Sequence, residues 1–206
     1  MSNNSTLSPS FFIDSQSDSI LKITNTLKDG YTDPVNLVIN IFNYVRDKIN
    51  YSIDMSLYTS PDDFIASITL ERKKGFCIPK AILLVTLLRT VGLPSRLHFA
   101  DIINHRSPDY LQELMGTNIF YFHGYTEVFL DNHWWKLTPS FDKKLCQKHD
   151  YPLCVFTGSN DATLSPRDLN ENLFIEYIND RGIYTDFPFS EMIRVFQKYY
   201  QGHFNE

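Results

Sequence analysis

The chain has 206 residues, a formal net charge of −5 and 43% hydrophobic residues, with 16 Phe and 12 Tyr among them. This length and aromatic content suffice for a substantial core, so we expect a single domain over residues 1–206. The negative charge gives no electrostatic reason to bind nucleic acid or an anionic membrane surface, and neither is expected as a partner.

The N-terminal sequence and the cysteine count indicate a compartment. Residues 1–6 are polar and lack the basic and apolar regions of a signal peptide. No apolar stretch approaches the ~18 residues that would cross a bilayer. Three cysteines are too few, and odd in number, for a disulfide framework. We therefore expect a reducing, cytoplasmic location.

The first part of the chain predicts two helices. Residues 1–13 look like a loose leader that ends in an apolar anchor, and a first helix is predicted to stop near Gly30. Asp33 is placed to cap an amphipathic helix over about 34–49, whose apolar residues recur at helical spacing. Residues 50–74 are predicted to form an irregular connection.

A third helix is predicted to begin at or just before Cys77 and to reach about Thr90. Pro79 fits only in its first turn, where the missing N–H is not needed. The helix stops at Gly92-Leu93-Pro94. Because it is apolar nearly all round, we expect it to be buried.

Strand character dominates the middle of the chain. Residues 96–103 predict one strand, and residues 120–130 and 134–137 predict a hairpin. The intervening residues 104–119 are predicted to hold a short helix that packs on the sheet. The alternative is that this insert caps an active site.

The last third, residues 143–206, predicts two further helices. One is expected from Ser165 to about Asp180, and the other begins at Ser190. Helices come first, then strands, then helices again, which indicates an α+β fold and not alternating βαβ units.

Cys77 is the residue whose surroundings indicate chemistry. A thiolate is the reactive form of cysteine, and the positive end of a helix dipole stabilises it. A histidine nearby can exchange a proton with the thiol, and the first backbone N–H groups of the helix can bind an oxyanion. The alternative from these residues alone is a small buried core cysteine.

Two stretches resemble the motifs of a known superfamily. Gly75-Phe76-Cys77, with Gly92-Leu93-Pro94-Ser95-Arg96 downstream, is similar to the cysteine motif of the transglutaminase-like superfamily. The run from His123 to Leu130, followed by a tryptophan pair, is similar to its histidine motif. The resemblance covers about residues 33–142. It implies a papain-like fold, with a nucleophile helix packed on an antiparallel sheet and additional C-terminal helices.

The same resemblance implies a Cys-His-Asp triad, in which Cys77 and His123 are the first two members. The Asp is expected at the end of the strand after the tryptophan, where this chain has Thr138-Pro139. A threonine oxygen can accept from the ring N–H but cannot balance an imidazolium charge. If Pro139 ends the strand, a turn can bring Asp142 back. Asp142 is therefore the predicted third member, with Thr138 as the alternative.

Other candidates carry less specific signals. Trp134, Tyr125 and His98 are predicted to contact substrate, because they lie on or beside the strands near His123. Cys146, His149 and Cys154 offer three metal ligands without a fourth, so no metal site is predicted. The implied chemistry needs no cofactor.

The leading hypothesis is cysteine-dependent acyl transfer on peptide or protein amides through a thioester. It covers peptide or isopeptide hydrolysis, deamidation and transglutamination, among which the sequence does not choose. One rival is a catalytically inactive module on the same fold that binds a peptide or protein. Another is acyl transfer to a small amine, as in the structurally similar arylamine acetyltransferases. The oligomeric state is not indicated.

Overall fold

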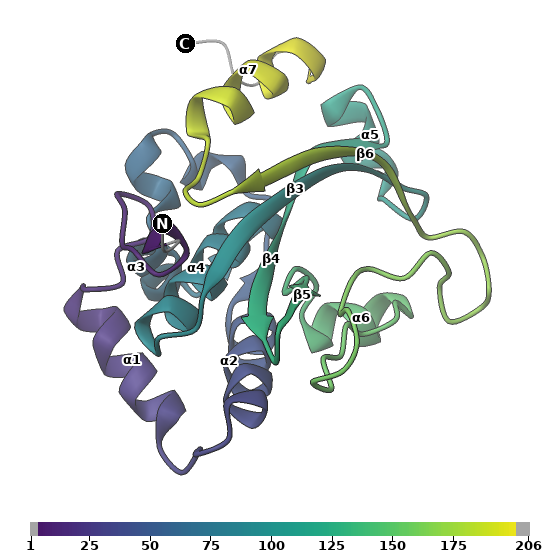
Figure 1. Cartoon of the computed structure of the whole chain (residues 1–206). Helices are drawn as coiled ribbons and strands as arrows, with labels where there is room; N and C mark the ends of the chain where they lie inside the picture. The colour runs from purple at the N-terminus through teal and green to yellow at the C-terminus, as the bar shows by residue number, and fades with distance from the viewer. Residues whose placement is uncertain (1–3, 201–206) are drawn as a thin grey trace.

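A curved antiparallel sheet with helices packed on one face forms the centre of the computed structural model (Figure 1), which describes residues 4–200. The strand order is β5-β4-β3-β6, and all three neighbouring pairs are antiparallel. The strands are β3 (Ser95–Asn104), β4 (Ile119–Leu130), β5 (His133–Leu137) and β6 (Ile175–Tyr184).

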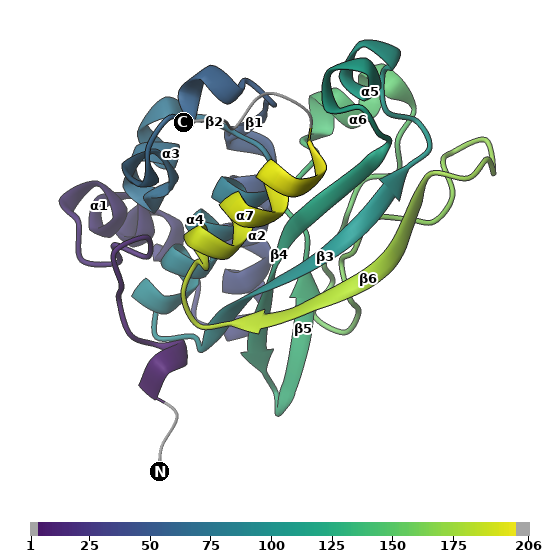
Figure 2. The same ribbon diagram turned by 90° about the horizontal axis from the view of Figure 1, so that it is seen from above.

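Helix α4 packs on β3 and β4, and α1, α2 and α3 pack against α4. Figure 2 shows α7 on the same side of the sheet, near α4. The helices are α1 (Asp18–Lys28), α2 (Pro34–Lys48), α3 (Ala66–Arg72), α4 (Cys77–Thr90), α5 (Asp109–Met115), α6 (Lys143–His149) and α7 (Phe189–Tyr199). Shorter elements are the 3-10 turns η1 (Asn4–Thr6), η2 (Met55–Leu57) and η3 (Pro61–Phe64), and the parallel pair β1 (Asn50–Tyr51) and β2 (Lys74–Gly75). Within residues 4–200, each helix is too short or too polar to cross a lipid bilayer.

Helix α4 lies at the centre because its sequence is apolar on every side. Every residue from Cys77 to Arg89 is buried, which confirms the prediction of a buried helix. Even Lys80 is fully buried, and its Nζ donates to the carbonyls of Arg46 and Ile49 at 3.0 and 2.6 Å. These carbonyls lie at the end of α2, so Lys80 fixes the packing of α4 on α2.

Close contact between α4 and β4 depends on a glycine. A Cβ atom added at Gly124 would lie 3.0 Å from Cε1 of Phe99 and 3.2 Å from Cα of Ile78. Two residues along the strand, Thr126 Oγ1 donates to the carbonyl of Ala81 at 3.1 Å. Only glycine lets the first turn of α4 lie this close to the strand.

A bulge interrupts the pairing of β3 and β4 immediately before His123. Phe122 has a φ of +61°, in the left-handed region that such residues rarely adopt. Its N–H donates to Oδ1 of the buried Asp101 at 3.0 Å, and the same oxygen accepts from Nε of Arg181. Asn179 donates to the other carboxylate oxygen at 3.0 Å. Asp101 therefore holds the backbone conformation that sets the direction of His123.

The strand predicted over 120–130 has the expected core face. Phe122, Thr126, Val128 and Leu130 are all buried. The opposite face is covered as well, because Tyr125 on it stacks on the ring of His98 from β3 and contacts the ring of Tyr177 from β6, at centroid distances of 4.6 and 6.2 Å. Consequently Tyr125 is also buried.

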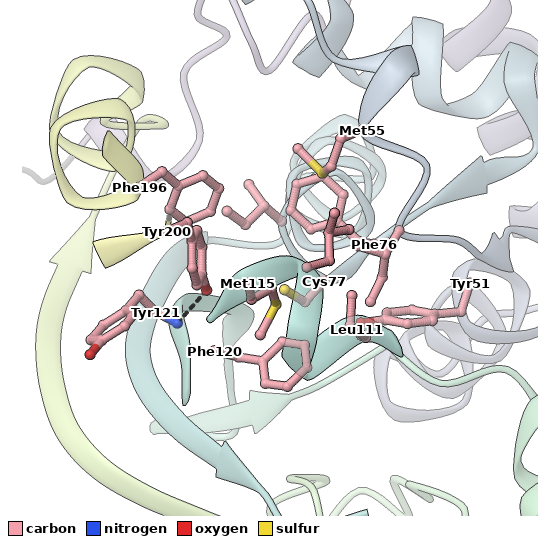
Figure 3. Close-up of a pocket in the computed structure, with 13 residues that line it drawn as sticks. Tyr51, Met55, Phe76, Cys77, Leu111, Met115, Phe120, Tyr121, Phe196 and Tyr200 are labelled. Carbon is pink, nitrogen blue, oxygen red and sulfur yellow. Dashed lines mark hydrogen bonds between the residues drawn. The ribbon is translucent and has the colours of Figure 1, made fainter. Parts of the chain in front are cut away.

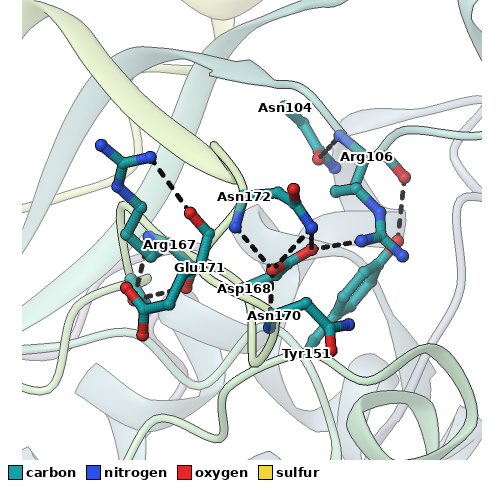
Figure 4. A network of polar contacts seen from close by, with 9 residues as sticks. Asn104, Arg106, Tyr151, Arg167, Asp168, Asn170, Glu171 and Asn172 are labelled. Carbon is teal, nitrogen blue, oxygen red and sulfur yellow. Dashed lines mark hydrogen bonds and ion pairs between the residues drawn. The ribbon is translucent and has the colours of Figure 1, made fainter.

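A polar network around Asp168 anchors the long connection between α6 and β6 (Figure 4). The carboxylate of Asp168 accepts from the N–H groups of Asn170 and Asn172 at 2.8 and 3.0 Å and pairs with Arg106. The carbonyl of Arg106 accepts from the hydroxyl of Tyr151 at 2.9 Å. Since Arg106 belongs to the insert 104–119, this network ties the insert to the C-terminal connection.

Two sequence predictions of secondary structure are wrong. Residues 50–74 are not irregular throughout, since they contain α3 and the short pair β1 and β2. The helix predicted over 165–180 is absent, and β6 begins at Ile175 instead. The apolar residues Leu173, Phe174 and Tyr177 satisfy a helical spacing, but β6 is an edge strand whose sides are mostly exposed. This segment is extended because it pairs with β3, and that pairing cannot be inferred from the sequence of the segment itself.

Candidate active site

The thiol of Cys77 lies at the N-terminus of α4, with only 8% of the residue exposed. The N-cap residue, Phe76, contributes no side-chain hydrogen bond to the first turn. Burial raises the pKa of the Cys77 thiol to about 11, although the backbone N–H groups of Gly124, Ile78 and Cys77 itself act in the opposite direction. The helix N-terminus alone predicts a lowered pKa, but desolvation outweighs it in this closed site.

His123 precedes Gly124 on β4, so its backbone adjoins the amide that faces the thiol. The ring is buried, and Nε2 has no hydrogen-bond partner among residues 4–200. Burial lowers the pKa of His123 to about 3. Burial therefore favours the neutral form of both the thiol and the imidazole.

Thr138 follows the last residue of β5. Since Thr126 pairs with Leu137, the register continued by one residue puts Thr138 opposite Tyr125, on the same strand face as His123. Thr138 is fully buried, and its Oγ1 makes no hydrogen bond of ordinary geometry within residues 4–200, although the Tyr177 hydroxyl faces it. These two atoms are among eight buried side-chain atoms of the described residues that make no hydrogen bond, so this feature alone does not mark a functional site.

Asp142 has a structural role at the N-cap of α6. Its Oδ1 accepts from the N–H of Leu145 at 3.0 Å, and its Oδ2 accepts from the N–H of Tyr51 at 2.8 Å. Within the described chain, no hydrogen bond or ion pair joins Asp142 to His123. The two carboxylate oxygens connect α6 to β1, and the role of Asp142 as third triad member stays a prediction.

The three residues predicted to contact substrate make contacts with other side chains of the sheet. Trp134 packs under the guanidinium of Arg96, which lies 3.8 Å from the centre of its ring. His98 stacks on Tyr125 with ring centroids 4.6 Å apart and bonds to Glu127 at 2.7 Å. None of Trp134, Tyr125 and His98 is among the described residues that line the pocket at Cys77. His123 is not among them either, and its ring lies 6.3 Å from that of Tyr125, so substrate contact by these three residues stays a prediction.

An apolar pocket of about 110 Å³ lies beside the thiol (Figure 3). Leu111, Leu114 and Met115 from α5 form part of its wall, and Phe196 and Tyr200 from α7 and its C-terminal end form another part. The insert 104–119 thus contributes to the enclosure of Cys77, which agrees with the alternative prediction that this insert covers the site.

Sequence reasoning missed most residues of this pocket. Tyr51, Ile53 and Met55 belong to the segment predicted as an irregular connection, and Phe196 belongs to the C-terminal helix. These segments are far apart in the chain, and only the fold brings them to Cys77. The one available signal was the row of apolar residues on the predicted C-terminal helix, which indicates a buried face but not what it covers.

A second, wider pocket adjoins the first and leads outward. Its volume is about 630 Å³, and it shares Tyr51 and Leu111 with the pocket at the thiol. Its lining continues to Lys148 and His149 at the end of α6. The wider pocket is partly polar, since Asp54, Asn104 and Lys148 also line it, and the shared residues connect it to the apolar pocket at Cys77.

The side chains of Cys146, His149 and Cys154 each make contacts other than with one another. The Sγ atom of Cys154 donates to the carbonyl of Thr163 at 3.2 Å, and Cys146 contacts the carbonyl of Phe141 at 4.0 Å. His149 stacks on Tyr151 instead. Among the described residues, no group of three His, Cys, Asp or Glu side chains is arranged to hold a metal ion.

Comparison with known proteins gives one family match. Residues 22–139, more than half of the chain, match the family model described as the transglutaminase-like superfamily. A search of curated proteins finds no match.

The fold also occurs in solved structures. A proposed cysteine protease from Cytophaga hutchinsonii superposes with a TM-score of 0.53 at 14% identity, covering 89% of this chain and 55% of that one. The periplasmic domain of TgpA from Pseudomonas aeruginosa gives a TM-score of 0.48 at 15% identity, covering 68% of this chain and 48% of that one. The chain thus spans about half the length of these proteins. The first likeness indicates a shared fold.

Proposed function

The chain belongs to the transglutaminase-like superfamily, and we propose that it is a cysteine enzyme that transfers acyl groups from amides. Membership of this superfamily supports cysteine-dependent chemistry on amides as the general class of function. The observation that carries the proposal is the position of the Cys77 thiol, at the start of α4 and beside the backbone amide of Gly124. Gly124 directly follows His123, whose buried Nε2 has no hydrogen-bond partner among the described residues.

The reaction begins with removal of the thiol proton by neutral His123 as Cys77 attacks the amide carbonyl carbon. An S–C bond forms, and the carbonyl oxygen becomes an oxyanion. The protonated imidazole then donates its proton to the amide nitrogen, the C–N bond breaks, and the amine leaves. A thioester on Cys77 remains. Water or an amine attacks it, with His123 acting again as base and then acid.

Backbone N–H groups are placed to bind the developing oxyanion. Those of Cys77 and Ile78 are at the start of α4, where a helix has no internal acceptor for them, and that of Gly124 reaches the thiol from β4. Donors of this kind typically contribute 10²–10³ in rate.

We assign the third position to Thr138, the alternative to the predicted Asp142. The oxygens of Asp142 already accept from two backbone N–H groups, whereas Oγ1 of Thr138 is buried without a partner of ordinary geometry. A threonine can accept the ring N–H of His123 and orient it, but it leaves the imidazolium without a counter-charge. This agrees with the depressed pKa of His123.

An inactive module that binds a peptide or protein is the second candidate. The neutral thiol and imidazole favour it, as does the threonine at the third position. Acyl transfer to a small amine ranks third. Peptide or protein amides are the proposed substrates, and the cytoplasmic location and the lack of nucleic-acid and membrane partners stay predictions.

Alkylation by iodoacetamide between pH 6 and 10, followed by peptide mass spectrometry, separates the first two candidates. Cys146 and Cys154 serve as internal controls, because burial also raises their pKa values, to about 11 and about 12. An enzyme predicts that Cys77 reacts faster than both controls and that His123→Ala removes this advantage. Reaction of Cys77 at the rate of the controls, unaffected by His123→Ala, indicates the binding module.

A further inference from the structure

We infer that the pocket beside Cys77 selects the acyl group of the substrate, and that it accepts a short aliphatic acyl group of ~4 carbons, counting the carbonyl carbon that the thiol attacks. This inference rests on the proposed function, because it names the substrate class of the same site. Three observations carry it: the lining of the pocket, its volume and its connection to solvent.

The lining excludes charged acyl groups. None of the described residues around the pocket is charged, and most contribute only carbon or sulfur atoms (Figure 3). The hydroxyl of Tyr200 already accepts from the N–H of Tyr121 at 2.7 Å. Burial raises the pKa of Tyr51 well above its ordinary value, so this side chain also stays neutral. A carboxylate or ammonium group in this pocket would lose its hydration without gaining a partner.

The volume limits the length of the chain. An apolar cavity of ~150 Å³ stays dry and binds benzene, which has six carbon atoms. By the same measure the pocket of about 110 Å³ has room for ~4 carbon atoms. An acetyl group would leave it partly empty, and an octanoyl group would exceed it. Each buried methylene is expected to increase kcat/KM by about fourfold until the pocket is full.

The wider pocket has room for the amine side of the substrate amide. It shares Leu111, Leu114 and Phe120 with the pocket at the thiol and continues toward Lys148. With the acyl chain held beside Cys77, the amine side of the amide extends into this wider pocket. When the C–N bond breaks, the amine takes up the proton from His123 and leaves toward solvent.

A series of 4-nitroanilides that differ only in the acyl group tests the inference. With acetyl, butanoyl, isovaleryl, hexanoyl, octanoyl and succinyl amides, we expect kcat/KM to rise about 15-fold from acetyl to butanoyl, at about fourfold per methylene. It should then fall for octanoyl and be at least about tenfold lower for succinyl. A flat series, or a preference for succinyl, overturns the inference while leaving amide cleavage itself intact.

A variant with an enlarged pocket tests the inference independently of folding. Partial misfolding lowers the rate with every substrate, whereas a larger pocket changes which acyl group is preferred. Met115 lies in the wall of the pocket beside the nucleophile (Figure 3). Met115→Ala should move the preferred acyl chain toward hexanoyl, whereas Glu113→Ala, on the exposed side of the same helix, should leave the profile unchanged. An unshifted optimum in Met115→Ala contradicts the inference.

Failure of the proposed function is detected separately. If no anilide is cleaved, the binding of butyramide and of succinamate to Cys77→Ala is followed by NMR of the methionine methyl groups, with Met115→Ala to assign its signal. Saturable perturbation of the Met115 signal by butyramide but not by succinamate supports the pocket even though the enzyme proposal has failed. No perturbation by butyramide overturns the inference.

Discussion

The Cα atom of Ile78 lies so close to Gly124 that a Cβ atom on residue 124 would be 3.2 Å from it. Ile78 follows the nucleophile in sequence, and Gly124 follows the histidine. The contact between these two residues therefore sets the distance between the two reactive groups. The glycine in the histidine motif is explained by this close approach.

Gly124→Ala should displace the start of α4 from β4. We expect a loss of roughly 1–3 kcal/mol in the free energy of unfolding, because the added methyl group overpacks the site and strains it. The folded fraction should also lose acyl transfer, measured as product formed per mole of folded protein. Gly92→Ala is the control: Gly92 has a φ of +82° and open space around it, so alanine there costs stability without moving the site. Equal specific activity in both variants would contradict this account.

Replacement of Thr138 and Asp142 separates their roles. Thr138→Val removes a buried hydroxyl that lacks a good partner, so stability should stay equal or rise, while kcat falls at least about tenfold through loss of ring orientation. Asp142→Ala should lower the free energy of unfolding by about 0.5–2 kcal/mol, since it removes the N-cap of α6. The activity of the folded Asp142 variant should be retained. Denaturant unfolding and kcat/KM on the same preparations give both quantities, and the reverse pattern would assign the third position to Asp142.

Acid should destabilise the protein through His123. Its folded pKa is lowered to about 3, below the ordinary value of 6.5, so the unfolded chain binds a proton as the pH falls through 6.5 while the folded chain does not. Stability therefore decreases from pH 6.5 towards pH 3, with a slope of up to about 1.4 kcal/mol per pH unit. Urea unfolding at several pH values should show a shallower slope for His123→Gln. An unchanged slope would mean that His123 is not buried as a neutral ring.

The bulge before His123 depends on Asp101. Asp101→Ala removes the acceptor for the N–H of Phe122 and leaves Arg181 without its carboxylate, so a loss of about 1–3 kcal/mol is expected. Because the left-handed conformation of Phe122 is then unsupported, kcat should also fall. Asn179→Ala removes only one hydrogen bond to the same carboxylate and should cost about 0.5–1.5 kcal/mol without affecting kcat. Parallel loss of kcat in both variants would show that the effect is not specific to the bulge.

Local sequence predicted those parts of the structure that local interactions determine. Asp33 caps α2 through the N–H of Asn36, and Pro79 lies in the first turn of α4, as expected. The hairpin turn is another such part, because Asp131 and Asn132 adopt the left-handed conformation that a tight turn requires. These signals, together with the resemblance, were enough to predict the fold class.

The remaining features depend on contacts between distant segments. Strand β6 forms because its backbone pairs with β3, although its own side chains are mostly polar or exposed. The pocket at Cys77 is assembled from the segment after α2, from α5 and from α7. The pKa of Cys77 depends on such contacts too. The helix terminus was visible in the sequence, whereas the burial that raises the pKa arises only from packing.

The formation of a thioester on Cys77 tests the central claim most directly. The protein is mixed with excess butanoyl 4-nitroanilide, quenched in acid at short times and digested, and the mass of the Cys77 peptide is measured. We predict a butanoyl adduct on Cys77 that appears with the release of nitroaniline, forms about 10²–10⁴-fold more slowly in His123→Ala and is absent in Cys77→Ala. Release of nitroaniline that persists in Cys77→Ala, or an adduct that forms at the same rate without His123, would contradict the account.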